Sequence, residues 1–246
     1  MGLKIAIHQP NLFPRLKVLQ KLANADVWCV LDSVQYCTRE YQNRTTIIPT
    51  HGDNSPFYLS IPVSKSNERK SRDSKINEIT ITNPNYTEYI EQTLSHAFRS
   101  AKYWDSIKNL IINFEAYPKS DRLTDLCVNI TKYLLQIANK KPVLIYSSEL
   151  PVEGKASELI ANLCRYLEHN TYLTDSGSYN YLKSCHFEGI EVLWQNWIEP
   201  IEKGENINSW RNISCLNYLS RFGTELFSQH LLNAEFKINT EWQSQQ

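Results

Sequence analysis

Polar side chains that could carry chemistry follow two neighbouring apolar runs near the start of the chain. Residues 4–7 lead into His8 and Asn11, and residues 27–31 lead into Asp32. Where such runs are parallel strands of an open sheet, ligands bind outside the carboxyl ends of the strands. A histidine side chain can transfer a proton near neutral pH, and a carboxylate can act as a base. His8 and Asp32 are therefore the candidate catalytic residues.

Both residues also have an ordinary structural interpretation. A lone histidine is commonly a hydrogen-bonded polar residue, and Asp32 could cap the turn that follows its strand. Nearby, Arg44 could clamp a carboxylate or a phosphate, because the guanidinium fork matches two oxygen atoms. The candidate substrate-binding residues of this first region are Gln9, Asn11, Gln35, Tyr36, Asn43 and Arg44.

A second polar cluster follows the apolar run 171–174 and includes the Ser-Gly-Ser sequence at 176–178. Serine and glycine after a strand can form a turn whose exposed N–H groups hold an anion. The alternative is an ordinary strand-to-helix turn with a serine cap. Two residues that open the predicted last helix could bind substrate or could only cap that helix. The candidates from these regions are Ser176, Gly177, Ser178, Tyr181, Asn212 and Ser214.

The sequence predicts no metal site and assigns no cofactor. The six histidines are scattered and form no HExxH pattern, and the six cysteines contain no CxxC pair. A GxxxxGK[ST] loop for ATP phosphates is also missing.

Composition and charge limit the classes of partner. Lys and Arg number 26, as do Asp and Glu, so the formal net charge is zero and a dominant attraction to nucleic acid is not expected. No apolar run approaches the length of a membrane helix, and polar residues at 9 and 11 interrupt the first apolar stretch, which argues against a signal peptide. We expect a cytoplasmic protein with a small-molecule substrate; its oligomeric state stays open.

Hydrophobic periodicity predicts a mixed α/β fold. Strands at 4–7 and 27–31 flank a helix over 12–25 with Pro14 in its first turn, a pattern typical of a right-handed βαβ unit. Further strands are predicted at 45–48, 57–63, 76–82, 143–146, 171–174 and 190–194, and further helices at 85–117, 120–139, 155–167 and 214–232. We expect a single domain over 1–246, with a mixed, mainly parallel sheet, βαβ units flanked by helices, and a helical lobe near 85–139.

Several segments resemble the WbqC-like protein family. The opening stretches IAIHQPNLFP, ANADVWCVLDSVQY and YQNRTTI carry the resemblance most specifically, and FYLSIPV, HAFRSAKYW, YLTDSGSYNYL, FEGIEVLWQNW and NISCLNYLSRFG follow in order. The resemblance implies a role in bacterial O-antigen and surface-polysaccharide biosynthesis, in which transfer of glycine to an amino sugar has been suggested. The positions that carry over are His8, Gln9, Pro10, Asn11, Pro14, Asp32, Gln35, Tyr36, Asn43, Arg44, Ser176, Gly177, Tyr181, Leu182, Asn212 and Ser214.

The chain departs from the usual family pattern at a few positions. Residues 14–18 read Pro-Arg-Leu-Lys-Val where Pro-Trp-Leu-Gly-Tyr is usual, Ser33 replaces a common Asp, and Tyr41 replaces a common Trp. These departures bear on the identity of the substrate more than on the fold.

Three functions fit these observations. The first is transfer of an amino acid to a nucleotide-linked amino sugar, with His8 or Asp32 as base, and with Arg44 and the turn 176–178 as anion clamp. The second is a nucleotidyl- or glycosyltransferase that acts on a nucleotide sugar. The third is a non-catalytic module that binds a sugar nucleotide. An enzymatic function requires His8 and the loops that bear Asp32 and Arg44 to face one water-accessible cavity.

Overall fold

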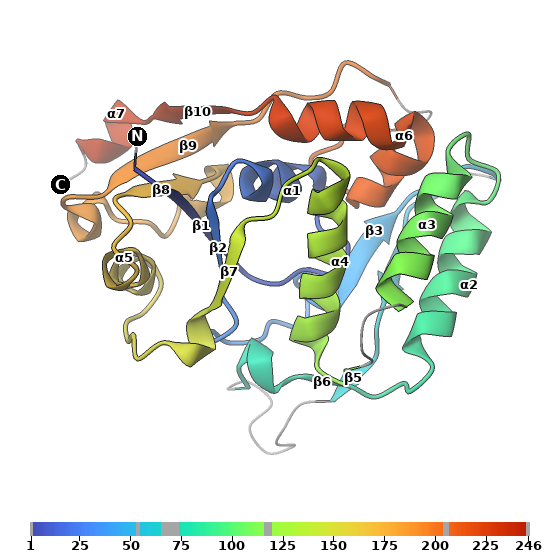
Figure 1. Cartoon of the computed structure of the whole chain (residues 1–246), viewed down its shortest axis with the longest axis horizontal. Coiled ribbons are helices and arrows are strands. Elements are labelled where there is room, and N and C mark those ends of the chain that lie inside the picture. Colours follow the sequence, from blue (N-terminus) through green and yellow to red (C-terminus); the bar gives the residue numbers. More distant parts are fainter. Residues whose placement is uncertain (1, 53–54, 65–73, 116–119, 204–206, 245–246) are drawn as a thin grey trace.

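The protein is built around a six-stranded sheet in which five strands run parallel (Figure 1). The computed structural model describes residues 2–52, 55–64, 74–115, 120–203 and 207–244. The strands are β1 (Lys4–His8), β2 (Val27–Val30), β7 (Val143–Tyr146), β8 (Thr171–Thr174), β9 (Glu191–Asn196) and β10 (Glu235–Ile238), in the order β10-β9-β8-β1-β2-β7. Only β10 pairs antiparallel. The predicted α/β class with a mainly parallel sheet is confirmed.

Both faces of this sheet are apolar because helices cover both. Successive strand residues point to opposite faces, so Ile5 and Ile7 of β1 enter one core cluster while Ala6 enters the other. Helix α1 (Leu16–Ala23) packs in the cluster that contains Ala6, and α5 (Ser157–Tyr166) packs in the opposite one. Double coverage explains why the central strands β1 and β2 read as nearly continuous apolar runs.

The order of the strands creates a crevice beside β1. The chain runs from β1 through α1 to β2 and later to β7 on one side, then returns to β8 and β9 on the other side. The connection after β1 therefore leads to one side of the sheet, and the connection after the neighbouring strand β8 leads to the other side. In open α/β sheets such a switch point is where the carboxyl ends of the strands bind ligands.

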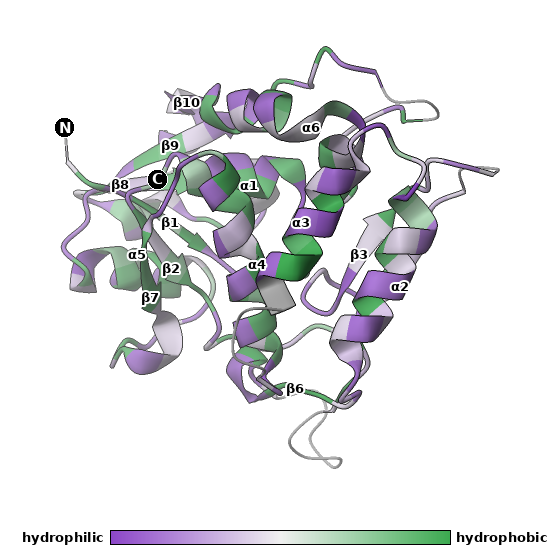
Figure 2. Cartoon of the chain, turned by 45° about the vertical axis from the view of Figure 1, so that its right-hand side comes forward, coloured by the Kyte–Doolittle hydropathy of each residue, from purple (hydrophilic) through white to green (hydrophobic). Residues whose placement is uncertain are grey.

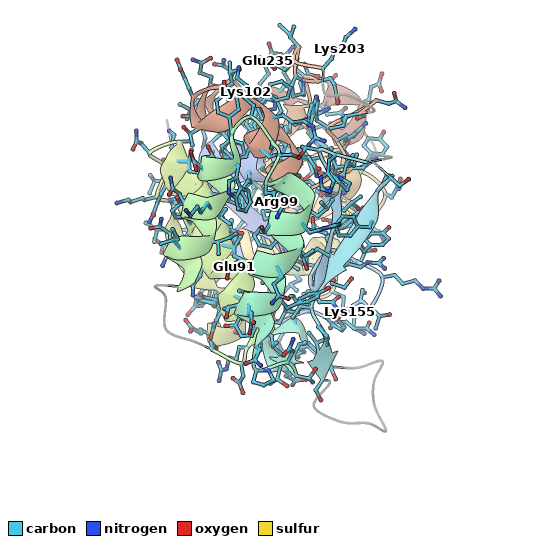
Figure 3. The ribbon with its side chains drawn as sticks, turned by 90° about the vertical axis from the view of Figure 1, so that its right-hand side faces the viewer. Glu91, Arg99, Lys102, Lys155, Lys203 and Glu235 are labelled. Atoms are coloured by element: carbon cyan, nitrogen blue, oxygen red, sulfur yellow. The ribbon has the colours of Figure 1, made fainter. Side chains whose placement is uncertain are left out.

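A helical lobe lies beside the sheet, on the right in Figure 1, as the sequence predicts. Its helices are α2 (Tyr86–Phe98), α3 (Trp104–Glu115) and α4 (Leu123–Ile137), and two small antiparallel ribbons, β3 (Arg44–Ile47) with β4 (Phe57–Ser60) and β5 (Val63–Ser64) with β6 (Thr80–Ile81), accompany them. Hydrophilic and hydrophobic turns alternate along α2 and α3 in Figure 2, which is typical of helices with one buried face. Figure 3 shows Glu91, Arg99 and Lys102 on the outside of the lobe, where all three are exposed.

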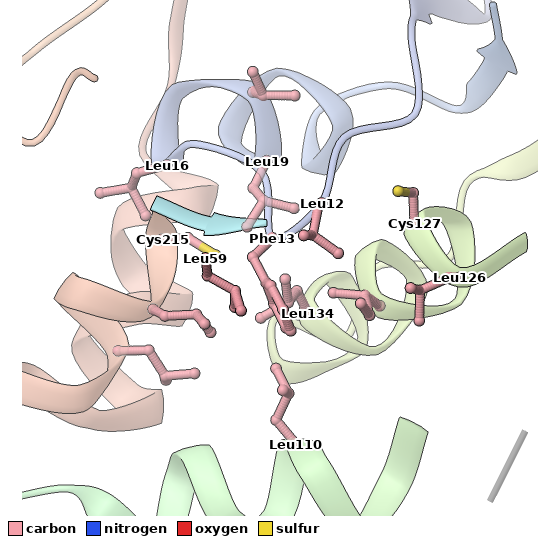
Figure 4. Packing of buried hydrophobic residues seen from close by; sticks show 14 of the residues in the cluster. Leu12, Phe13, Leu16, Leu19, Leu59, Leu110, Leu126, Cys127, Leu134 and Cys215 are labelled. Carbon is pink, nitrogen blue, oxygen red and sulfur yellow. The ribbon is translucent and has the colours of Figure 1, made fainter. Parts of the chain in front are cut away.

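One apolar cluster joins the lobe to the sheet. Figure 4 shows Leu12 and Phe13 from the first βα connection and Leu19 of α1 facing Leu134 of α4 and Leu110 of α3, and all five are buried. This continuous core supports the single-domain prediction, which stays a prediction. Within the described chain, no helix combines the length and the apolar character needed to cross a membrane.

Two local predictions were wrong for backbone reasons. The first helix begins at Leu16 rather than at 12, because Phe13 adopts φ 44° and Arg15 is extended, so Pro14 lies outside the helix. The predicted strand at 76–82 is a 3-10 turn (Ile76–Glu78) followed by the two-residue β6. Apolar spacing alone does not separate these outcomes in short segments.

Helix α6 (Cys215–Leu232) is kinked at Gly223, which adopts φ 78° and ψ −179°. This region of backbone conformation is essentially restricted to glycine. A Cβ atom at Gly223 would also lie 2.7 Å from Cδ1 of Tyr103. We expect Gly223→Ala to lower the free energy of unfolding by about 2 kcal/mol or more, from strain and overlap together.

Urea denaturation of Gly223→Ala and of a control variant, Gly189→Ala, measures this cost. Gly189 is the matched control, because it also has a positive φ (77°) but open space around its Cα. Gly189→Ala should cost only about 1 kcal/mol, from strain alone. Equal losses in the two variants would contradict the role assigned to the Tyr103 contact.

Candidate active site

A polar cavity of about 270 Å³ opens at the switch point, beyond the carboxyl ends of β1 and β8. Strand β1 supplies His8, α1 supplies Lys17 and Lys21, and the turn after β8 supplies Asp175. The full lining is Ile7, His8, Gln9, Asn11, Arg15, Lys17, Lys21, Leu31, Glu40, Tyr41, Gln42, Asp175, Gly177, Ser178 and Tyr181.

A chain of polar contacts crosses the floor of this cavity. Lys21 Nζ lies 2.7 Å from Asp175 Oδ2 and 3.4 Å from His8 Nδ1. His8 Nε2 lies 3.3 Å from Asn11 Oδ1. Asn11 Nδ2 donates to the Pro10 carbonyl, which orients the amide so that its oxygen faces the imidazole. We therefore assign the tautomer in which His8 Nδ1 accepts from Lys21 and Nε2–H donates to Asn11.

The surroundings of His8 keep its imidazole neutral. Burial and the charge of Lys21 lower the pKa of His8 from 6.5 to about 3, and Asp175 offsets only part of this effect. A neutral imidazole whose Nδ1 already accepts a hydrogen bond is a poor base at pH 7. It can instead polarise a substrate oxygen by donating from Nε2.

Asp175 is the carboxylate that neutralises part of the charge on α1. Burial alone would raise the pKa of Asp175, but Lys21, His8 and Lys17 together hold that pKa well below its ordinary value. Asp175 Oδ1 also accepts a hydrogen bond from Gly177 N at 2.9 Å. The carboxylate therefore stays ionised, and it fixes both the lysine of α1 and the turn after β8.

Two further cations line the cavity with weaker partners. Lys17 is 7% exposed, and its Nζ is 3.9 Å from Asp175 Oδ1. Burial lowers the pKa of Lys17, and Asp175 counteracts that effect. The Arg15 guanidinium carbon lies 4.4 Å from the centre of the Tyr41 ring, a cation–π contact.

The family comparison covers most of these residues. The model of the WbqC-like protein family matches residues 9–226. The chain belongs to the WbqC-like protein family. An uncharacterized protein of Mycobacterium tuberculosis (strain ATCC 25618 / H37Rv), Rv1507c, is 22% identical over 194 residues, which cover 78% of this chain and 81% of that protein. No solved structure matches the chain.

In this WbqC-like chain, six of the residues singled out from the sequence line the cavity together. They are His8, Gln9, Asn11, Gly177, Ser178 and Tyr181. The Ser178 and Tyr181 hydroxyls are 3.0 Å apart. Ser176 does not line the cavity; its Oγ accepts a hydrogen bond from Arg211 at 2.6 Å.

Asp32 lies outside the cavity lining and is 2% exposed. Its carboxylate accepts hydrogen bonds from Ser147 Oγ, from Ser148 N and from Ser148 Oγ, at 3.1, 3.0 and 2.8 Å. These bonds join the ends of the adjacent strands β2 and β7. The arrangement favours the structural interpretation of Asp32 over the catalytic one.

The remaining candidates lie outside the cavity lining and have structural contacts. Asn43 Nδ2 donates to the Ile61 carbonyl. Arg44 donates to the Arg39 carbonyl, and its guanidinium lies 4.5 Å from the centre of the Tyr58 ring. Ser214 caps α6 through Leu216 N and also donates to the Phe13 carbonyl.

Three more candidates complete this set. Gln35 pairs with Lys75 in an isolated antiparallel β-bridge. Tyr36 is 5% exposed, and its backbone N–H donates to the Ser74 carbonyl. Asn212 is exposed just before α6. Among the residues that the structure describes, no group of three or more His, Cys, Asp and Glu side chains could hold a metal ion.

Sequence reasoning missed Arg15, Lys17 and Lys21, and it included Asp175 in the second polar cluster without giving it a role. One signal was available: Lys17 and Lys21 are four residues apart, so they share a face of α1. Every residue of α1 is buried. A lysine pair inside a wholly buried helix calls for a buried acidic partner, but its position 154 residues away in the chain is not readable from one sequence.

The two lysines should respond oppositely to replacement by methionine. Lys21→Met leaves the buried Asp175 carboxylate without its 2.7 Å partner and should lower the free energy of unfolding by about 3 kcal/mol or more. Lys17→Met removes a buried cation that has no close partner, so its stability should equal or exceed that of the parent. Chemical denaturation at pH 7 measures both, and equal destabilisation would contradict the assigned pairing.

His8 should make folding stability depend on pH. Its folded pKa of about 3 lies below 6.5, so between these values the unfolded chain binds more protons than the folded one. The stabilisation from neutral His8 is fully present above pH 6.5 and is lost as the pH falls toward 3. The stability difference between the parent and His8→Gln should therefore shrink from pH 7 to pH 5 in urea titrations. A constant difference would show that His8 is not held neutral.

Proposed function

We propose that this protein is a cytoplasmic transferase of bacterial O-antigen or surface-polysaccharide biosynthesis, and that it adds an amino acid such as glycine to a nucleotide-linked amino sugar. The observation that carries the proposal is the cavity at the switch point, where His8, Lys21 and Asp175 meet a second pair of cations. Membership of the WbqC-like family and the resemblance described above support the biosynthetic setting.

The chemistry of acyl transfer fits this set of side chains. The amine nitrogen of the sugar attacks the carbonyl carbon of an activated glycyl donor, such as a glycyl ester or acyl phosphate. A C–N bond forms, the bond to the leaving group breaks, and the amine proton passes to solvent. Negative charge develops on the carbonyl oxygen in the tetrahedral intermediate, and preorganised donors stabilise it.

We assign His8 to this oxyanion as a neutral donor. His8 Nε2 lies 3.3 Å from Asn11 Oδ1. When substrate binds, the Nε2–H would donate to the substrate oxygen in place of Asn11. Lys21 holds the tautomer by donating to Nδ1, and Asp175 holds Lys21. The three hydrogen bonds accepted by Asp32 support a structural role for it, so the proposal gives Asp32 no chemical step. Neither Asp32 nor Arg44 lines the cavity. The proposal therefore rests on His8, Lys21 and Asp175, and not on the shared cavity of His8, Asp32 and Arg44 that was expected from the sequence.

Mass spectrometry of a reaction with nucleotide-linked amino sugars and activated glycyl donors tests the proposal. The parent should form the glycylated sugar, and His8→Ala should slow turnover about 100-fold, the scale of a lost oxyanion donor. His51→Ala is the matched control, because His51 is exposed and lies outside the cavity lining, and its turnover should equal that of the parent. Full turnover in a folded His8→Ala protein would remove His8 from the mechanism.

The same reaction separates the two alternatives. Release of pyrophosphate or free nucleotide without glycylation would indicate a nucleotidyl- or glycosyltransferase. Thermal stabilisation by sugar nucleotides with no turnover would indicate a binding module.

A further inference from the structure

The cavity contains more buried positive charge than its own carboxylates neutralise. Asp175 serves two ammonium groups, and it lies 2.7 Å from Lys21 but 3.9 Å from Lys17. The longer distance exceeds that of a hydrogen bond. Glu40 also lines the cavity, but it is exposed, so solvent screens its charge. Lys17 is therefore a buried ammonium whose only ion pair among the described residues is long and is shared with Lys21.

Arg15 adds to this excess. Its guanidinium is placed on the face of Tyr41, which lines the same cavity. Its Nε atom is buried and has no hydrogen-bond partner among the residues described. An unpaired buried donor of this kind costs free energy unless a ligand accepts from it. Two cationic side chains thus have only weak partners on one cavity wall, and they lie close together in the chain: Arg15 directly precedes α1, and Lys17 lies in its first turn.

Gln42 supplies an independent sign of a ligand. Its side chain is 1% exposed, and its Nε2 donates to Gln9 Oε1 at 2.7 Å. This bond fixes the orientation of the amide and leaves Gln42 Oε1 buried and without a partner in the described chain. A buried acceptor on a cavity wall matches a hydroxyl or N–H group of a bound molecule.

We propose that Arg15 and Lys17 form an oxyanion subsite for the phosphate of a sugar phosphate, and that Gln42 Oε1 accepts a hydrogen bond from the sugar. An oxyanion supplies a closer counter-charge for Lys17 than Asp175 does, and the acceptor that Arg15 Nε lacks. The cavity of about 270 Å³ lies at the small end of ligand pockets. It suits a phosphorylated monosaccharide, so the nucleoside of a nucleotide sugar would extend outside.

The identity of the sugar rests on the proposed function, whereas the oxyanion subsite does not. This subsite also replaces the expected clamp at Arg44, whose guanidinium lies over Tyr58 outside the cavity lining.

Calorimetric titration of the full chain tests the subsite with glucosamine 1-phosphate, inorganic phosphate, glycine and uncharged N-acetylglucosamine. The parent should bind glucosamine 1-phosphate most tightly and inorganic phosphate more weakly. Lys17→Met should raise the dissociation constants of both phosphates at least 10-fold while the protein stays folded. Lys155→Met is the matched control, because Lys155 is exposed on the surface in Figure 3, and it should bind like the parent.

Two more variants separate the two halves of the subsite. Arg15→Gln should weaken both phosphates, as Lys17→Met does. Gln42→Leu should weaken glucosamine 1-phosphate at least fivefold and leave inorganic phosphate unchanged, because the proposal places the phosphate at Arg15 and Lys17 and only the sugar at Gln42 Oε1. Equal loss of both ligands in Gln42→Leu would overturn the assignment of the sugar contact.

Other outcomes overturn the subsite itself. Unchanged phosphate affinity in Lys17→Met would do so. Tighter binding of glycine than of either phosphate would also do so, because it would show that the cations bind a carboxylate. The readouts also separate the two proposals: a parent that binds glucosamine 1-phosphate but forms no glycylated sugar keeps the subsite and loses the transferase. Equal rates of sugar glycylation in the parent and in Lys17→Met would support the transferase and contradict the subsite.

Discussion

The buried ion pair between Lys21 and Asp175 is the interaction on which the site depends. It joins the helix after β1 to the turn after β8, the two elements that diverge at the switch point of the sheet. Because Lys21 also donates to His8, the same pair sets the tautomer and the neutral state of the imidazole. A buried pair of this kind gains little stability over an apolar pair of the same size. Its presence is more easily explained by the chemistry of the cavity that it borders.

Much of the fold could be predicted from the sequence because its signals are local. The runs at β1, β2 and β7 are short, nearly continuous and apolar, which is typical of strands in a parallel sheet. Strand β8 reads Thr-Tyr-Leu-Thr, residue types that favour strands. The helical lobe followed from amphipathic spacing. The start of α1 did not follow, because the positive φ of Phe13 is set by its buried tertiary position and not by a turn residue.

The site could be predicted only in part, for a physical reason. Residues that follow strands, such as His8 and Gly177, were found because the carboxyl ends of parallel strands gather at one edge of the sheet. Asp32 also follows a strand, β2, but it contacts the end of β7, which lies on the side of β2 away from the switch point. Its carboxylate therefore accepts hydrogen bonds from serines and does not line the cavity. Arg15 precedes α1 and Lys17 lies in its first turn, so neither directly follows a strand; both lie within the stretch where this chain departs from the usual pattern of the family.

The distance in sequence between Lys21 and Asp175 has a consequence for biosynthesis of the protein itself. During translation Lys21 is synthesised 154 residues before its acidic partner. The chain is synthesised from its amino-terminal end, so the lysines of α1 must stay hydrated, or pair elsewhere, until β8 and the turn after it emerge. A nascent chain cut short before residue 175 would therefore contain the first half of the sheet but no finished cavity.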